Sequence, residues 1–78
     1  MDRVDNILKD VKKELKRATR IHGEFNSIHE AYAVILEELE EFWDEVRKRK
    51  EQRSRNAIRE ELIQIAAASC KAILSLKI

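Results

Sequence analysis

The sequence predicts an all-α protein, and three observations point to that fold class. The chain of 78 residues has no proline and a single glycine, Gly23, so it lacks the turn residues that hairpins and strand–helix connections use. Its apolar residues recur three and four positions apart over three stretches, which is the spacing of one helical face. A chain this short forms one domain with a small core, so we expect a single domain over residues 1–78 that assembles with further copies of itself.

Three helices are expected, at residues 3–22, 27–50 and 55–77. The first ends before Gly23, because glycine readily adopts the left-handed conformation that closes a helix. The second begins at Ser27, which can form a capping box with Glu30 three residues later. The third follows a charged joint without apolar residues and begins after Ser54 or Asn56, either of which can cap it.

The third helix is expected to lie at an interface between subunits. Ile63, Cys70 and Leu74 form a second apolar side next to its main stripe, and three helices offer too few neighbours to cover both. We therefore expect a homodimer or a homotetramer. Tyr32 and Trp43 lie on the apolar face of the second helix and are interpreted as core residues, and Cys70 is interpreted as a small buried apolar residue.

Phe25, in the joint between the first two helices, has two interpretations. The favoured one is a plug that packs the first helix against the second, because aromatic residues near short joints usually cover the core. The other is that Phe25, together with His22, contacts a nucleobase.

Charge and hydropathy exclude several classes of protein. A formal net charge of +1 argues against a generally basic nucleic-acid binder. No apolar run approaches the roughly 18 residues that a transmembrane helix needs, so no membrane association is expected. Residues 1–5 contain no apolar export signal, and the single cysteine forms no internal disulfide. These features predict a cytoplasmic location.

The charges are unevenly distributed along the chain. Residues 27–46 hold seven acids and no Lys or Arg, whereas residues 47–59 hold seven bases and one acid. Among these bases Lys48 is the strongest candidate for a phosphate contact, because it lies on the same side of the second helix as the acids before it. A structural role is the alternative, since cations complement the dipole at a helix C-terminus. Nucleic-acid binding through this basic run is disfavoured, because the adjacent acids would repel a phosphate backbone.

The acids of the second helix form a strip at the edge of its apolar face. Glu38, Glu41 and Glu45 fall within about 60° of one another on a helical wheel. Glu61 and Gln64 share one face of the third helix, where small residues permit close packing against another helix: Ala57, Ala68 and Ala72. Carboxylate and amide oxygens on facing helices suit Mg²⁺, with Mn²⁺ as the alternative ion. A solvated acidic face is the competing interpretation.

Two acidic motifs resemble those of a known enzyme family. A first motif, Glu37-Glu38-Leu39-Glu40-Glu41, is followed after nineteen residues by a second, Glu61-Leu62-Ile63-Gln64. They resemble the E-E-x-x-E and E-x-x-D pair of the MazG-like, all-α nucleoside triphosphate pyrophosphohydrolases. Residues 29–36 and 65–68 are also similar to the small single-domain bacterial and phage members, and the resemblance covers about residues 22–74. It implies a four-helix bundle core that oligomerisation completes.

The resemblance also implies an activity and its residues. The expected reaction is hydrolysis of a ribo- or deoxyribonucleoside triphosphate to a monophosphate and pyrophosphate. The metal would be held by four side chains, namely Glu38, Glu41, Glu61 and Gln64. Either Glu37 or Glu38 would orient or deprotonate the attacking water. The phosphates would be bound by Lys48, with Arg55 or Arg59 as further contacts.

Gln64 departs from the family motif, which has an acid at this position. An amide oxygen can coordinate Mg²⁺ but brings no negative charge, so weaker metal binding is expected. The competing hypothesis that Gln64 favours is a non-catalytic helical module that binds nucleotide or metal, or mediates assembly.

Overall fold

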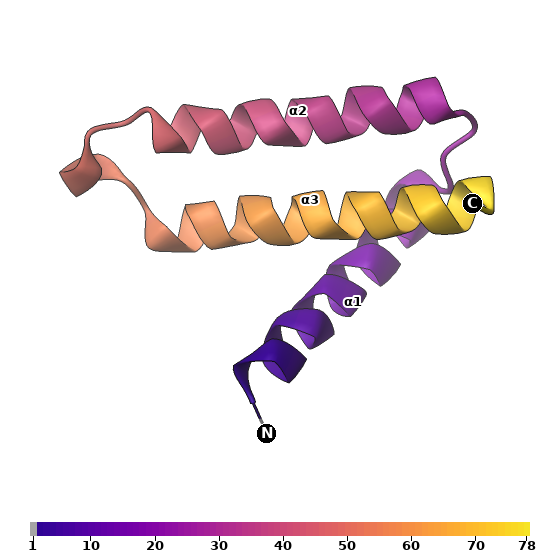
Figure 1. Ribbon diagram of the computed structural model, residues 1–78, viewed down its shortest axis with the longest axis horizontal. Coiled ribbons are helices and arrows are strands. Elements are labelled where there is room, and N and C mark those ends of the chain that lie inside the picture. The colour runs from indigo at the N-terminus through magenta and orange to yellow at the C-terminus, as the bar shows by residue number, and fades with distance from the viewer. Residues whose placement is uncertain (1) are drawn as a thin grey trace.

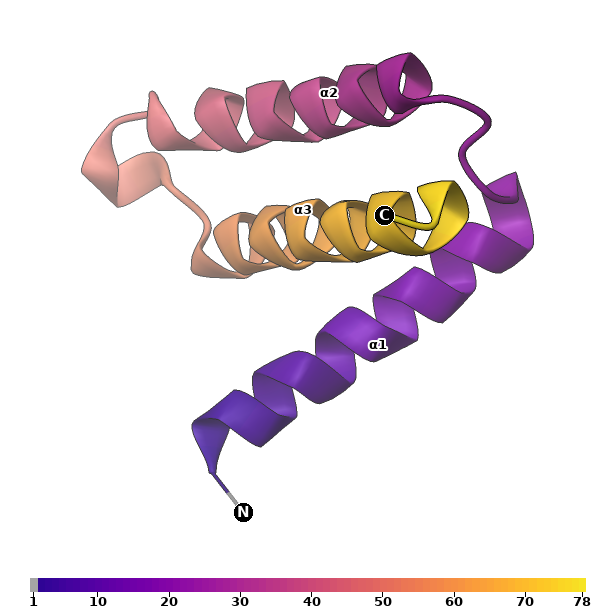
Figure 2. The same cartoon turned by 45° about the vertical axis from the view of Figure 1, so that its right-hand side comes forward.

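The computed structural model describes residues 2–78, which form three α-helices and one short 3₁₀ helix. The elements are α1 (Arg3–His22), α2 (Ile28–Val46), η1 (Lys50–Gln52) and α3 (Arg55–Leu76). No β-strand occurs in this part of the chain, which confirms the all-α fold class. Figures 1 and 2 show α2 and α3 side by side as an antiparallel hairpin, with α1 running obliquely along α3. None of the described helices is both long and apolar enough to cross a membrane.

Local capping interactions fix the helix starts where the sequence predicts them. The hydroxyl of Ser27 accepts a hydrogen bond from the backbone N–H of Glu30 at 3.0 Å. The carboxylate of Glu30 in turn accepts from the N–H of Asn26, one residue before the cap, at 2.7 Å. Ser54 caps α3 by accepting from the N–H of Ala57 at 3.1 Å. Gly23 follows α1 with a φ of 74°, the left-handed region that favours glycine.

Helix α2 ends at Val46, so the expectation that it continues to residue 50 is wrong. The residues after Val46 have no apolar face to pack, and the side chain of Arg53 folds back on the helix end. Its Nε donates to the carbonyl oxygens of Val46 at 2.9 Å and Lys48 at 3.1 Å. These bonds satisfy carbonyl groups that a continuing helix would otherwise bond internally.

The core is small and rich in alanine. Phe25, Ala31 and Ala72 form its centre, where the α1–α2 joint meets α2 and α3. Phe25 is 7% exposed, and its backbone N–H donates to the hydroxyl of Ser75 at 3.1 Å. Phe25 therefore has a packing role, but it lies against α2 and α3, and α1 packs on α3 rather than on α2. Ala67 and Ala68 are also buried on α3, so small side chains provide the contact surface between the helices.

Three residues expected in the core are exposed instead. Tyr32 is 67% exposed and Trp43 is 58% exposed, and Cys70 is an exposed free thiol. Tyr32 and Trp43 are exposed because α2 carries two adjoining apolar stripes and α3 covers only the one that contains Ala31, whereas Cys70 lies on a side of α3 that neither α1 nor α2 covers. The other stripe is open in the single chain and consists of Ile28, Tyr32, Leu36, Leu39 and Trp43.

Glu45 links the two ends of the α2–α3 connection. Its carboxylate accepts from the Nζ of Lys48 at 2.9 Å and from the backbone N–H of Ser54 at 2.7 Å. The Lys48 hydrogen bond, followed by that from Ser54, lowers the pKa of Glu45 below its usual value. Glu45 is therefore held in its charged form by donors on both sides of the connection.

We expect the Glu45→Ala variant to lower the free energy of unfolding at neutral pH, because the Ser54 amide and the Lys48 ammonium lose their acceptor. A depressed carboxyl pKa contributes stability above its unfolded value, and that contribution is lost as the pH falls through the folded value. Urea midpoints of the variant and the wild type should therefore differ at neutral pH and converge once the pH falls below the lowered, folded-state pKa of Glu45. The exposed Glu51→Ala variant is the control and should follow the wild type. A constant difference across this pH range would contradict the role given to Glu45.

Candidate metal centre

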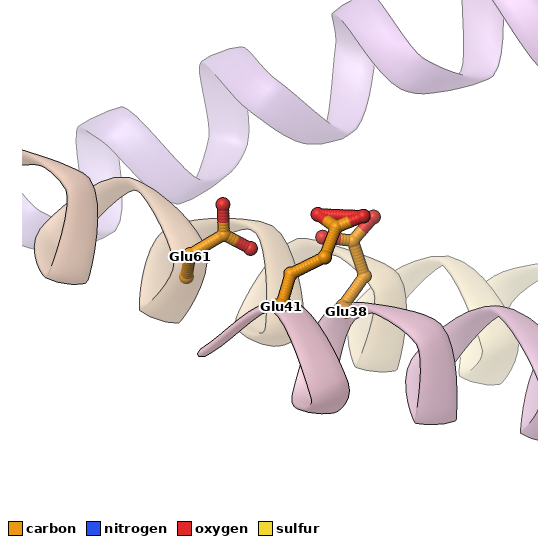
Figure 3. Close-up of side chains that lie close together, drawn as sticks. All are labelled: Glu38, Glu41 and Glu61. Atoms are coloured by element: carbon orange, nitrogen blue, oxygen red, sulfur yellow. The ribbon is translucent and has the colours of Figure 1, made fainter. Parts of the chain in front are cut away.

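Three carboxylates from two helices converge at one point of the hairpin. Glu38 and Glu41 lie on α2 and Glu61 lies on α3, and each offers an oxygen atom within 4.8 Å of the other two. Figure 3 shows the three carboxylates directed into a common space between the helices. The structure thus brings together all three acids that the sequence analysis assigned to a metal.

The convergence follows from spacing and from side-chain size. Glu38 and Glu41 are three residues apart, so they project from one face of α2. On α3 the neighbouring buried positions are alanines, among them Ala68, and small side chains let the two helix backbones approach closely. Glu61, which lies two turns before Ala68, can therefore face the pair on α2.

The cluster is electrostatically unfavourable without a cation. Burial, followed by the charges of Glu41 and Glu61, raises the pKa of Glu38 above its usual value. The pKa of Glu61 is also raised, by burial first and then by Glu41. One buried oxygen on each of these two residues, Oε2, has no hydrogen-bond donor. Buried carboxylate oxygens without donors, directed at one point, are the ligands that a hard divalent cation such as Mg²⁺ prefers.

The other two residues assigned to this site lie next to the cluster. Gln64 is one turn beyond Glu61 on α3, and it lines the same cavity as Glu37 and Glu38. The cavity has a volume of about 350 Å³ and lies between α2, α3 and the second half of α1. Its size is at the lower end of the range for small-molecule sites.

Two basic residues that the sequence analysis did not single out also line this cavity, Arg17 and Lys71. Arg17 forms an ion pair with Glu14 at 2.7 Å. Lys71 is buried and lies seven residues beyond Gln64, two turns along the same face of α3. This spacing could have identified Lys71 from the sequence, because it continues the polar face of α3 that begins with Glu61 and Gln64.

The expected phosphate-binding residues lie away from this cavity. The Lys48 ammonium bonds to Glu45, and the Arg59 guanidinium pairs with Asp10 of α1 at 2.8 Å. Arg59 also lines a second cavity, of about 300 Å³, together with Arg17 and Gln64. Arg55 is exposed at the start of α3. Phosphate contacts by these three bases stay predictions.

We expect Glu38→Gln to raise the melting temperature of the metal-free protein at neutral pH, because it removes one of three repelling charges. Relief of a like-charge pair on a helix contributes a few tenths of a kcal/mol, and burial adds to it. Millimolar Mg²⁺ should then stabilise the wild type but not Glu38→Gln or Glu61→Gln, since a ligand stabilises only the state that binds it. Differential scanning calorimetry with and without Mg²⁺ measures both effects.

The matched control is Glu40→Gln, which removes an exposed charge from the same helix. It should respond to Mg²⁺ as the wild type does. An undiminished Mg²⁺ response in Glu38→Gln would remove this residue from the metal centre.

Comparison with protein-family models, curated proteins and solved structures finds no match to this chain. The resemblance to the MazG-like family therefore rests on the two motifs and the residues around them. The independent support for a function is the cluster of Glu38, Glu41 and Glu61 and the cavity beside it.

Proposed function

We propose that this chain is a Mg²⁺-dependent nucleoside triphosphate pyrophosphohydrolase of the MazG-like type. The observation that carries the proposal is the convergence of three carboxylates with two buried oxygens that lack donors, on Glu38 and Glu61. Further support is that Glu38 also borders a cavity large enough for a small molecule. The two acidic motifs of the sequence add the family resemblance.

The residues have distinct roles in the proposed reaction. Glu38, Glu41 and Glu61 would hold the metal, with the amide oxygen of Gln64 next to them. Bound Mg²⁺ would neutralise charge on the triphosphate oxygens. We assign proton acceptance to Glu37, because it lines the cavity outside the three-carboxylate cluster, and Glu38 is the alternative.

The step is a substitution at the α-phosphorus. The oxygen of the attacking water forms a bond to this phosphorus while the bond to the bridging oxygen of the β-phosphate breaks. Pyrophosphate leaves with that bonding electron pair, and the water proton passes to the carboxylate. The products are a nucleoside monophosphate and pyrophosphate.

Glu61→Gln is expected to lower the rate of pyrophosphate release by about a hundredfold or more, because one metal ligand loses its charge. The assay uses Mg²⁺ and a panel of ribo- and deoxyribonucleoside triphosphates. Gln64→Asp restores the acid of the family motif and should reach half-maximal rate at a lower Mg²⁺ concentration. Glu40→Gln should match the wild type.

The outcomes separate the candidate functions. Failure to release pyrophosphate from any triphosphate would overturn the enzyme proposal. Mg²⁺ binding without turnover would instead favour the non-catalytic module, which the neutral Gln64 side chain supports. Full activity in Glu61→Gln would overturn the assignment of the site.

The proposal includes assembly into a homodimer or homotetramer with a MazG-like bundle core. Several large apolar side chains of α2 and α3 are exposed in the single chain: Tyr32, Leu36, Leu39, Trp43, Leu62, Ile73 and Leu74. A monomer that exposes many large apolar side chains commonly uses them for interaction, and a second copy of the same chain would offer the same side chains. Leu62, Ile73 and Leu74 belong to α3, the helix for which the sequence predicts an interface between subunits.

Light scattering at micromolar concentration is expected to give a mass of two or four chains. Leu39→Lys and Trp43→Lys should shift that mass toward one chain, because a charge would be buried at the contact. Glu51→Lys, in the exposed connection, is the control and should leave the mass unchanged. A monomeric wild type would contradict the assembly proposal.

A further inference from the structure

A buried lysine of α3 lacks a counter-ion. Lys71 is 6% exposed and lines the cavity beside Glu38. Its Nζ lies 4.4 Å from the centroid of the Phe25 ring. Within residues 2–78 its ammonium belongs to none of the ion pairs and donates no hydrogen bond to a side chain or carbonyl oxygen. The Lys71 ammonium is therefore held over the Phe25 ring with its hydrogen-bond donors unused by the described residues, so a ligand in the cavity that carries an acceptor can bond to it.

The cavity differs in chemistry between its two ends. Near the metal centre it is lined by Glu37, Glu38 and Gln64. Lys71 is two helical turns farther along α3, about 10 Å from Gln64 along the helix axis. At that end the walls include the Phe25 ring and the apolar side chains of Val34, Ala67 and Ala68.

This composition suits a flat heterocycle better than a phosphate chain. Five carboxylates line the cavity, on Glu14, Glu24, Glu30, Glu37 and Glu38. The two cations are Lys71 and Arg17, and Arg17 is already paired with Glu14. An anionic phosphate at the Lys71 end would thus meet more negative than positive charge, whereas a neutral base would bury its faces against apolar walls.

Building on the proposed function, we infer that the nucleoside part of the substrate occupies this cavity and that Lys71 donates a hydrogen bond to a carbonyl oxygen of the base. The ammonium has donors only, so it pairs with an acceptor. Guanine, uracil, thymine and cytosine carry a carbonyl oxygen, whereas adenine carries none. Lys71 is then a specificity-determining residue that selects oxo-bearing bases.

Nucleosides without phosphate test this inference apart from the metal centre. Two pairs differ by one carbonyl group: inosine and purine riboside, and uridine and its 4-deoxy analogue. The ring resonances of Phe25 in NMR titrations without divalent cations report occupancy of the cavity. A hydrogen bond to a charged donor predicts about tenfold or greater preference for the oxo member of at least one pair.

Variants at position 71 tie the preference to the ammonium. Lys71→Met keeps the length of the side chain over Phe25 but removes the donor, and it should abolish the preference. Lys71→Arg retains a donor and should keep part of it. Lys12→Met removes an exposed lysine of α1 and should leave the preference unchanged.

Equal affinity within both pairs, or a preference that survives in Lys71→Met, would overturn the inference. Should Lys71→Met fail to fold, the wild-type pairs together with Lys71→Arg decide it. Carbonyl preference without triphosphate hydrolysis would refute the proposed activity and leave the inference standing. Triphosphate hydrolysis without carbonyl preference would support the proposed activity and overturn the inference about Lys71.

Discussion

The close approach of α2 and α3 across alanine side chains is the constraint on which the candidate site depends. Ala31, on α2, and Ala67, on α3, are each 2% exposed, and Ala72 is nearly as buried. Larger side chains here would move the helix backbones apart. The carboxylates of Glu38 and Glu61 would then separate as well, because glutamate side chains are too short to meet across the wider helix–helix distance that leucines would impose. The same contact that forms the core therefore assembles the acids.

Helix α2 shows how partners decide the state of similar carboxylates. Glu38 and Glu45 lie two turns apart on one side of the helix, yet their pKa values move in opposite directions. Glu45 accepts hydrogen bonds from Lys48 and the Ser54 amide, whereas one buried oxygen of Glu38 has no donor and faces other acids. The acidic strip thus divides into a structural residue at the helix end and a cluster that is open to a cation.

Local signals explain which parts of the fold the sequence predicts. The helix starts depend on Ser27 and Ser54, whose hydroxyl groups bond to amides three residues away. The end of α2 depends on the Arg53 side chain, which bonds to the carbonyl oxygen of Val46 seven residues earlier. Helical periodicity does not predict that contact. Helical periodicity does not predict the exposure of Trp43 either, because it does not indicate which of two adjoining apolar stripes the neighbouring helix covers.

The candidate site divides in the same way between local and distant contacts. The grouping of Glu38 with Glu41 follows from helical spacing, and that of Glu61 with them follows from the alanine face of α3. The cavity beside them depends also on α1, whose second half provides Arg17 and His22 as part of the wall. The position of α1 relative to α2 depends on tertiary packing, which the periodicity of a single helix does not predict.

The order of charges along the chain acquires a different meaning in the folded molecule. The basic run after α2 suggests a phosphate-binding segment, but Lys48 and Arg53 stabilise the connection by bonding to Glu45 and to backbone carbonyls. The buried cation beside the candidate site is Lys71, which lies outside that run and two turns beyond Gln64 on α3. Lys48 and Arg53 thus stabilise the connection, whereas Lys71 reaches the wall of the cavity through helix packing.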